Sequence, residues 1–147
     1  MLLSKEVAVE LNLTGCRLKQ FMAAMLKQRN VDLTPEQFLL IDLLWNQGPL
    51  SQQQLADQMQ KDKNSVTKIV DAIERKGFVV RQQNPNDRRS NTIIPTEKAI
   101  ELKLGAKQVG VNLLDHMIQG ISEDELNQFL QTLRKLSDNM ETVSTEE

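Results

Sequence analysis

Few residues of this 147-residue chain could form a catalytic or metal-binding site. It contains one cysteine, Cys16, and one histidine, His116. These two are a hundred residues apart and too few for a structural zinc site of the Cys/His type, and one cysteine allows no internal disulfide. His116 stands in VNLLDHMIQ, where apolar residues have helical spacing, so we interpret it as a structural or solvent-edge histidine. The sequence therefore predicts neither an enzyme nor a cofactor.

Basic residues gather in one part of the chain. The net charge is −2, yet residues 51–91 carry eight Lys/Arg against five Asp/Glu, whereas residues 92–147 carry five against ten. The basic part ends on NPNDRRSN, residues 84–91. Asn, Pro and Asp suit a tight turn, but the two adjacent arginines need another reason. Cations concentrated in this way suggest a local surface for a polyanion, which the total charge alone would disfavour.

An amphipathic helix is expected within this basic part, from residue 63 to about 76, with Gly77 ending it. Val66, Ile69, Val70 and Ile73 fall at i, i+3, i+4 and i+7, which is one apolar stripe. The polar residues at the start of this helix are the candidates for contact with a partner: Lys63, Asn64, Ser65, Thr67 and Lys68.

The segments on either side have clear helix and strand signals. Thr34 with Gln37, and Ser51 with Gln54, have capping-box spacing, so helices should start at residues 35 and 52. Gly48-Pro49 ends the first of these, and the second is short, reaching about residue 59. Residues 78–81 and 92–94 are β-prone. They predict a hairpin with NPNDRRSN at its tip and Pro95 ending the second strand.

Helices are expected at both ends of the chain. The first spans residues 5–29, with a possible break at Gly15. A long helix should run from Thr96 to about 119, and Ser122 with Glu125 marks the start of the last one. The terminal helices have more apolar positions than a small domain can cover, which predicts a homodimer. The fold class is mostly α with a small β-hairpin wing, in a single domain of residues 1–147.

The membrane and secretion signals are weak. No apolar run reaches the roughly 18 residues that a membrane span needs. The N-terminus MLLSKEVAVELNL lacks a basic leader followed by a continuous apolar core. We therefore expect a cytoplasmic protein without a membrane partner.

Two helices followed by a hairpin describe a winged helix-turn-helix, and this arrangement predicts double-stranded DNA as the partner. A helix fits the major groove, where Lys and Asn meet base edges and Ser or Thr meets bases or phosphates. An arginine at the wing tip gains from the negative potential of a narrow minor groove. One alternative is that residues 63–76 form an ordinary amphipathic helix with a solvated polar face. Another is a winged-helix protein–protein interaction module without DNA binding. A DNA-binding protein should place Lys63, Lys68, Arg88 and Arg89 on one face of the dimer.

Four segments resemble, in order, the successive elements of the MarR family of bacterial transcription regulators: LTPEQFLLIDLLW, LSQQQLADQM, KNSVTKIVDAIERKGFVVR and NPNDRRSNTIIPTEKA. The resemblance implies a homodimer held by helices in residues 1–30 and 96–142, with a DNA-binding lobe at 34–95. It implies a ligand-responsive repressor of a pseudo-palindromic operator. In the family's wing the acid, here Asp87, orients the arginine, here Arg89, toward the minor groove, and Arg88 meets phosphate or solvent.

This chain also departs from the family pattern. Pro95-Thr96 and Ala99 stand where the family usually has Leu-Thr and Gly, and because proline lacks a donor the second wing strand is expected to be shorter. Oxidant-sensing relatives hold a reactive cysteine with tyrosines, and this chain has no Tyr, so Cys16 is either a sensor or a small buried apolar group. Zinc-sensing relatives use several histidines. A small anionic or aromatic effector remains the expected ligand, with Trp45 and Met22 serving either a pocket or the core.

Overall fold

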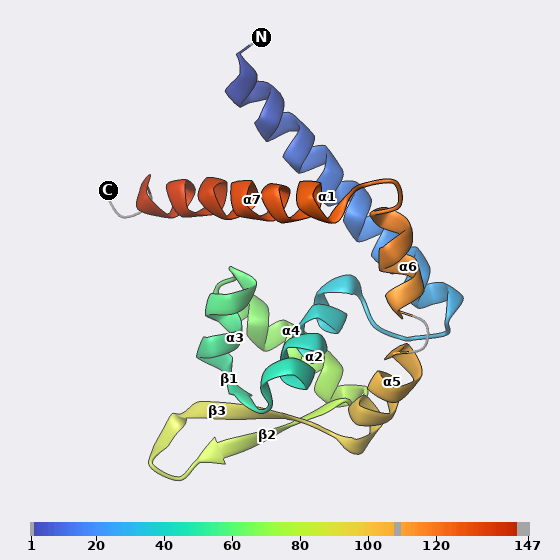
Figure 1. The fold of residues 1–147 in the computed structure, drawn as a ribbon. Coiled ribbons are helices and arrows are strands. Elements are labelled where there is room, and N and C mark those ends of the chain that lie inside the picture. The colour runs from blue at the N-terminus through green and yellow to red at the C-terminus, as the bar shows by residue number, and fades with distance from the viewer. Residues whose placement is uncertain (1, 108–109, 144–147) are drawn as a thin grey trace. The chain divides into compact units, whose positions relative to one another are not determined.

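The computed structural model describes residues 2–107 and 110–143, a mostly helical chain with one three-stranded antiparallel sheet (Figure 1). The side chains of residues 88–89, 106–107, 110–113 and 142–143 lie outside this description. The chain divides into two compact units, residues 1–108 and 109–147, and each is described by itself. In chain order, the elements are α1 (Leu3–Gln28), α2 (Pro35–Gln47), β1 (Leu50–Ser51), α3 (Gln52–Met59), α4 (Lys63–Arg75), β2 (Val79–Asn84), β3 (Asp87–Pro95), α5 (Glu97–Lys107), α6 (Gly110–Met117) and α7 (Glu123–Val143).

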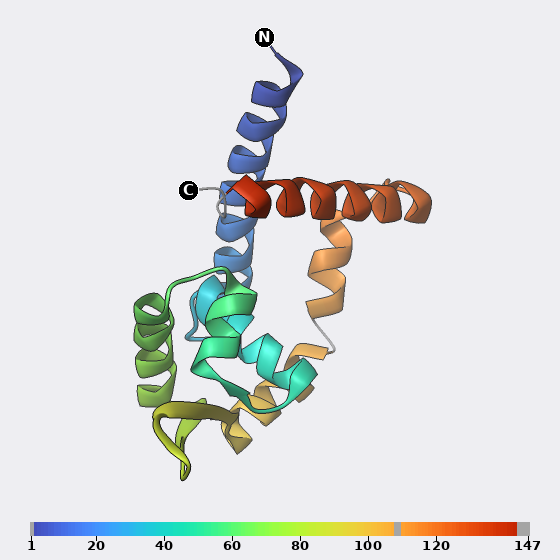
Figure 2. The same ribbon diagram turned by 90° about the vertical axis from the view of Figure 1, so that its left-hand side faces the viewer.

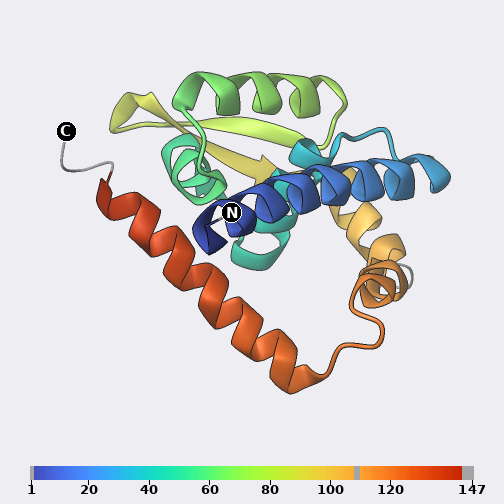
Figure 3. The ribbon, with the colours of Figure 1, turned by 90° about the horizontal axis from the view of Figure 1, so that it is seen from above.

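The hydrophobic core of the first unit lies between α2, α3, α4 and the sheet. The apolar stripe that the sequence predicts on α4 is buried at all four positions, which removes one side of that helix from water and leaves the opposite side for a partner. In Figures 2 and 3, α4 stands beside the hairpin of β2 and β3. The largest fully buried side chains are Leu40, Ile41, Leu44, Leu55, Val66, Val70, Ile73, Val79 and Ile93.

The capping boxes at α2 and α3 are confirmed. The Thr34 hydroxyl accepts from the Gln37 N–H, and the Gln37 side chain accepts from the Thr34 N–H. Ser51 and Gln54 repeat the same pair of bonds. Each box satisfies two backbone donors that the first helical turn would otherwise leave unpaired. The two helix starts are therefore fixed by local sequence.

Helix α1 is continuous from Leu3 to Gln28, so the possible break at Gly15 does not occur. One glycine in a long helix costs only about 1 kcal/mol, which 26 residues of helix tolerate. Cys16 is exposed on α1, so it is not a buried apolar group within this chain.

The sheet is larger than the sequence predicts, with strand order β1-β3-β2. The two-residue strand β1 pairs with Thr92 and Ile93 of β3, and both hairpin strands extend toward the tip. The expectation that Pro95 shortens the second strand is wrong, because β3 runs to Pro95, which pairs with Val79. Thr96 donates its N–H to the Phe78 carbonyl, and successive residues of a strand point their N–H groups to opposite sides. The nitrogen of Pro95 therefore points to the other side of β3, the side on which β1 lies. Since β1 pairs only with Thr92 and Ile93, no strand in the described part of the chain accepts a hydrogen bond opposite Pro95.

The helix expected from Thr96 to about residue 119 is instead described as two helices, α5 and α6, and α6 ends at Met117. Residues 108 and 109, between them, lie outside the described part of the chain. Gly120 has φ 82°, a left-handed conformation that glycine adopts without a Cβ clash. The Ser122 hydroxyl accepts from the Glu125 N–H at 3.2 Å and so caps α7 as predicted.

Within the described residues, no helix combines the length and apolar character needed to cross a membrane.

Candidate nucleic-acid interface

The polar face of α4 begins with a side-chain cap that the sequence analysis did not identify. The Asp62 carboxylate accepts from the Ser65 N–H at 2.7 Å. Hydrogen bonds from Ser65 to this carboxylate hold the pKa of Asp62 below its ordinary value of 3.8. The cap could have been predicted from the sequence, because Asp is a preferred N-cap residue and Asp62 directly precedes the helix.

Three of the five predicted contact residues on α4 are exposed. Lys63, Asn64 and Lys68 are exposed, and Ser65 is half-buried near the cap. Asn64 and Lys68 are four residues apart and lie on the side of the helix opposite its buried stripe. Lys63, the first residue of the helix, lies beside the stripe, three residues before Val66. The structure thus presents an amide and an ammonium group on one exposed helix face and a second ammonium group in the first turn, which is the residue chemistry that meets bases and phosphates.

Thr67 is placed differently from what the sequence suggests. Its hydroxyl donates to the Lys63 carbonyl at 2.9 Å and accepts from the Gln52 amide at 3.1 Å. Both interactions are internal to the protein. The Thr67 hydroxyl therefore serves the packing of α4 on α3, and its only spare hydrogen-bonding capacity is one further acceptor site.

Gln52, which the sequence analysis missed, is the one polar residue among the buried residues of the described chain, with 8% of its surface exposed. Its amide oxygen accepts from Asn91 of β3 at 3.4 Å, while its amide nitrogen donates to Thr67 of α4. A buried amide needs such partners, since leaving it unpaired would cost free energy. Spacing along the chain could not reveal the link to Asn91, which is 39 residues away.

The wing tip is a two-residue turn. Asn84 pairs with Asp87, Pro85 and Asn86 form the turn, and the Asn84 side chain accepts from the Asn86 N–H at 3.0 Å. This confirms that the Asn-Pro-Asn stretch makes the bend. Asp87 is exposed. The backbones of Arg88 and Arg89 belong to β3, but their side chains lie outside the described part of the chain, so their roles stay predictions.

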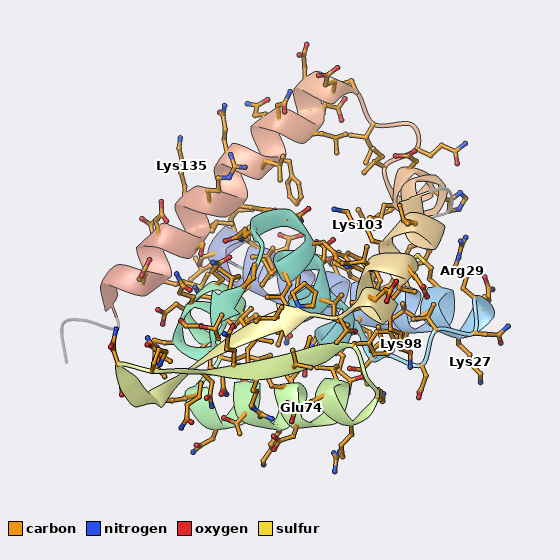
Figure 4. All side chains as sticks on the ribbon, turned by 90° about the horizontal axis from the view of Figure 1, so that it is seen from below. Lys27, Arg29, Glu74, Lys98, Lys103 and Lys135 are labelled. Atoms are coloured by element: carbon orange, nitrogen blue, oxygen red, sulfur yellow. The ribbon has the colours of Figure 1, made fainter. Side chains whose placement is uncertain are left out.

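The wing is fastened to α4 by Arg81, to which the sequence analysis gave no role. Its guanidinium bonds to the carboxylates of Glu74 and Asp71, and its backbone N–H donates to Glu74 as well. Figure 4 shows Glu74 on α4, the helix that lies beside the hairpin. Because Arg81 is only 20% exposed and engages two carboxylates, it holds β2 against α4 better than an isolated surface pair would.

A cleft of about 490 Å³ lies at the C-terminal end of α4, between the end of α1, the turn after α4 and the start of α5. Val31, Phe78 and Leu102 supply its apolar lining, and Arg29 and Lys98 are among its charged groups. Both cations are labelled in Figure 4. The Lys98 ammonium lies 4.5 Å from the centre of the Phe78 ring and donates to the Lys76 carbonyl, just after α4.

The remaining candidates have ordinary structural surroundings. Trp45 donates its indole N–H to the Ala99 carbonyl at 3.0 Å and packs edge-on against Phe38, so it belongs to the core. His116 is exposed on α6. No group of His, Cys, Asp or Glu within the described residues is arranged to hold a metal ion.

A short helix, a second helix with a polar exposed face and a twisted hairpin, all packed on one core, define a winged helix-turn-helix protein. A model of the MarR family matches residues 33–90. The HTH-type transcriptional regulator MhqR of Bacillus subtilis is 31% identical over 107 residues, which cover 73% of this chain and 74% of MhqR. The uncharacterized regulator YkoM of the same organism is 32% identical over 69% of this chain and 66% of its own length, just under two thirds.

The chain belongs to the MarR family of HTH-type transcriptional regulators. Members of this family are regulators and not enzymes.

Solved structures show the same fold. A MarR protein from Peptoclostridium difficile matches with a TM-score of 0.83 at 19% identity, covering 97% of this chain and 94% of that one. The S. aureus MepR–DNA complex matches with a TM-score of 0.79 at 23% identity, covering 90% of this chain and 96% of that one. Bordetella bronchiseptica BpsR, whose DNA binding is regulated by 6-hydroxynicotinic acid, matches with a TM-score of 0.80 at 20% identity, covering 94% of this chain and 97% of that one. At these identities the likeness concerns the fold.

Proposed function

We propose that this regulator binds a specific DNA operator through α4 and the wing. The observation that carries the proposal is the exposed surface of α4, where Asn64 and Lys68 stand opposite a fully buried apolar stripe and Lys63 is exposed in the first turn. A helix held in this way can enter the major groove with its first turns, where amides and ammonium groups discriminate bases and neutralise phosphates. The MepR–DNA complex is a protein of the same fold bound to DNA.

The wing completes the proposed interface. Arg89 is the proposed minor-groove contact, Asp87 orients it, and Arg88 meets phosphate or solvent. A short turn supports this role, because Pro85 and Asn86 leave the two arginines on the strand directly after the bend. Guanidinium groups are favoured where a narrow minor groove concentrates negative potential.

The operator is proposed to be pseudo-palindromic because the protein is proposed to act as a homodimer. Helix α1 exposes large apolar side chains, including Leu3 and Leu13, and α7 exposes Phe129, Leu130 and Met140. Surfaces of this kind are covered in a stable protein by a second copy or another partner. Two copies related by a twofold axis would present two α4 helices to two half-sites.

Selection of bound sequences from a random DNA pool tests this function. The proposal predicts enrichment of an inverted repeat whose half-sites are centred about one helical turn apart, or a multiple of that spacing. Absence of any enriched sequence would contradict DNA recognition and would favour the protein–protein interaction module instead.

We further propose that a small anionic or aromatic molecule releases the operator, so that the protein is a ligand-responsive repressor. The cleft beside Arg29 and Lys98 supports this proposal, because its volume is in the range of small-molecule sites and its apolar walls carry three cations against the two carboxylates of Asp32 and Glu101. An anion that draws the Lys98 ammonium away from the Lys76 carbonyl would alter the end of α4. Such an effector must bind the DNA-free state more tightly than the DNA-bound state.

The effector proposal is tested with 6-hydroxynicotinic acid and benzoate as probes. Calorimetric titration of wild type should show binding, and saturating probe should weaken operator affinity. Arg29→Met should reduce probe binding, whereas Lys27→Met, at an exposed position of α1 outside the cleft lining, should not. If Arg29→Met binds the probe as tightly as Lys27→Met and wild type do, this cleft is not the effector site.

A further inference from the structure

A directed chain of hydrogen bonds connects the wing to the first turn of α4. Asn91 of β3 donates to the Gln52 amide oxygen, the Gln52 amide nitrogen donates to the Thr67 hydroxyl, and that hydroxyl donates to the Lys63 carbonyl. The three distances are 3.4, 3.1 and 2.9 Å. This series of hydrogen bonds thus joins β3, α3 and α4 through the side chain of Gln52.

The direction of the chain fixes the orientation of the Gln52 amide. Because the proton of the Thr67 hydroxyl is given to Lys63, its oxygen is an acceptor toward Gln52, and only the amide nitrogen can donate to it. The amide oxygen is thereby turned toward Asn91. Hydrogen bonds arranged head to tail reinforce each other in a poorly hydrated interior, so a tilt of β3 would weaken more than one bond.

Gln52 contacts the wing close to its tip. Asn91 pairs with Gln83, the last regular pair before the register shift that begins between Gln83 and Asn84. Arg89, the proposed groove contact, is two residues from Asn91. At the other strand, Arg81 fastens β2 to Asp71 and Glu74, in the second half of α4. The wing is therefore attached to α4 at two separate points, and Gln52 provides the one nearer the tip.

We propose that Gln52 is a positioning residue that sets the angle of the wing tip relative to the recognition helix. Burial alone does not account for a glutamine here, because the neighbouring Leu55 and Ala56 already supply apolar surface from α3. An aliphatic side chain would fill the same space without holding β3. The inference rests on the proposed function, since it gives Gln52 an effect on DNA binding through Arg89.

Gln52→Met tests the inference, because methionine has a similar length and removes both hydrogen bonds. Operator affinity should fall by about tenfold, which is the value of one specific DNA interaction, while the melting temperature changes little. Gln58→Met is the matched control: Gln58 lies on the same helix but bonds to the exposed Gln47, and its replacement should leave affinity unchanged. Equal affinity of Gln52→Met and wild type would overturn the proposal.

A double-mutant cycle shows whether Gln52 acts through the wing. In an Arg89→Ala background the wing contact is already absent, so Gln52→Met should cost less than about twofold in affinity. A full tenfold further decrease would show a general structural effect and would also overturn the proposal. Asn91→Ala cuts only the link to β3 and should repeat the same pattern, which keeps the test decisive if Gln52→Met does not fold. If instead Arg89→Ala binds as well as wild type, the proposed wing contact is wrong and this inference, which acts through that contact, is overturned with it. Selection of bound sequences tests DNA recognition by α4 separately.

Discussion

At the scale of single residues, the interface depends on which polar side chains of α4 face outward. Sequence periodicity separated the buried stripe from the polar face, and Lys63, Asn64 and Lys68 are exposed as expected. It could not show that the Thr67 hydroxyl is held by Gln52 and Lys63, because a residue at the edge of the stripe can turn either way. That choice depends on a residue of another helix.

Lys68 gives the residue-scale prediction. Lys68→Ala should weaken operator binding and reduce the slope of log affinity against log salt by about one unit, because one phosphate contact releases about one counterion. Anisotropy titrations from about 50 to about 200 mM salt would measure both quantities. Lys27→Ala, on an exposed position of α1, is the control for removal of charge alone. If the salt slope and the operator affinity of Lys68→Ala equal those of wild type, Lys68 does not contact the DNA.

At the scale of elements, helix starts were predictable and the sheet was not. The capping boxes of α2 and α3 act within four residues, so the sequence alone identifies them. The lengths of β2 and β3 depend on pairing between strands, and the two-residue β1 exists only because β3 lies beside it. The fastenings by Gln52 and Arg81 likewise join different elements. Such contacts follow from the fold and leave no periodic signal.

The Asp62 cap gives the element-scale prediction. Since the folded-state pKa of Asp62 is depressed by hydrogen bonds from Ser65, the carboxylate stabilises α4 at pH values above its ordinary pKa of 3.8, and this stabilisation is lost as the pH falls through the folded-state pKa. Asp62→Asn keeps a cap but cannot titrate. Denaturant titrations between about pH 6 and pH 2.5 should show a larger decrease in stability on acidification for wild type than for Asp62→Asn. Parallel profiles would contradict the role of this carboxylate.

At the scale of the whole molecule, the apolar surface of α7 supports the proposed homodimer. Phe129 is 56% exposed and Met140 63% exposed on this helix, and large contiguous apolar patches on a protein surface mark interaction sites. The sequence already indicated this excess through the number of apolar positions. It could not show that residues 109–147 form a compact unit of their own, because that division depends on contacts between distant residues.

Phe129→Glu is the prediction at this scale. A charge placed in the proposed subunit contact should shift the protein from dimer to monomer in sedimentation velocity and lower operator affinity with it. Gln131→Glu, which adds the same charge at an exposed polar position of α7, should remain dimeric. If wild type sediments as a monomer at concentrations that saturate the operator, the homodimer proposal is wrong.

The most direct test of the proposed interface compares the two wing arginines on the selected operator. Arg89→Ala should weaken binding by about 1–3 kcal/mol, the value of one good specific contact, whereas Arg88→Ala should produce a smaller decrease that is similar for all DNA sequences. Anisotropy titrations at matched salt would measure both variants. Equal binding of Arg89→Ala and wild type would contradict the account of the wing as a DNA-reading element.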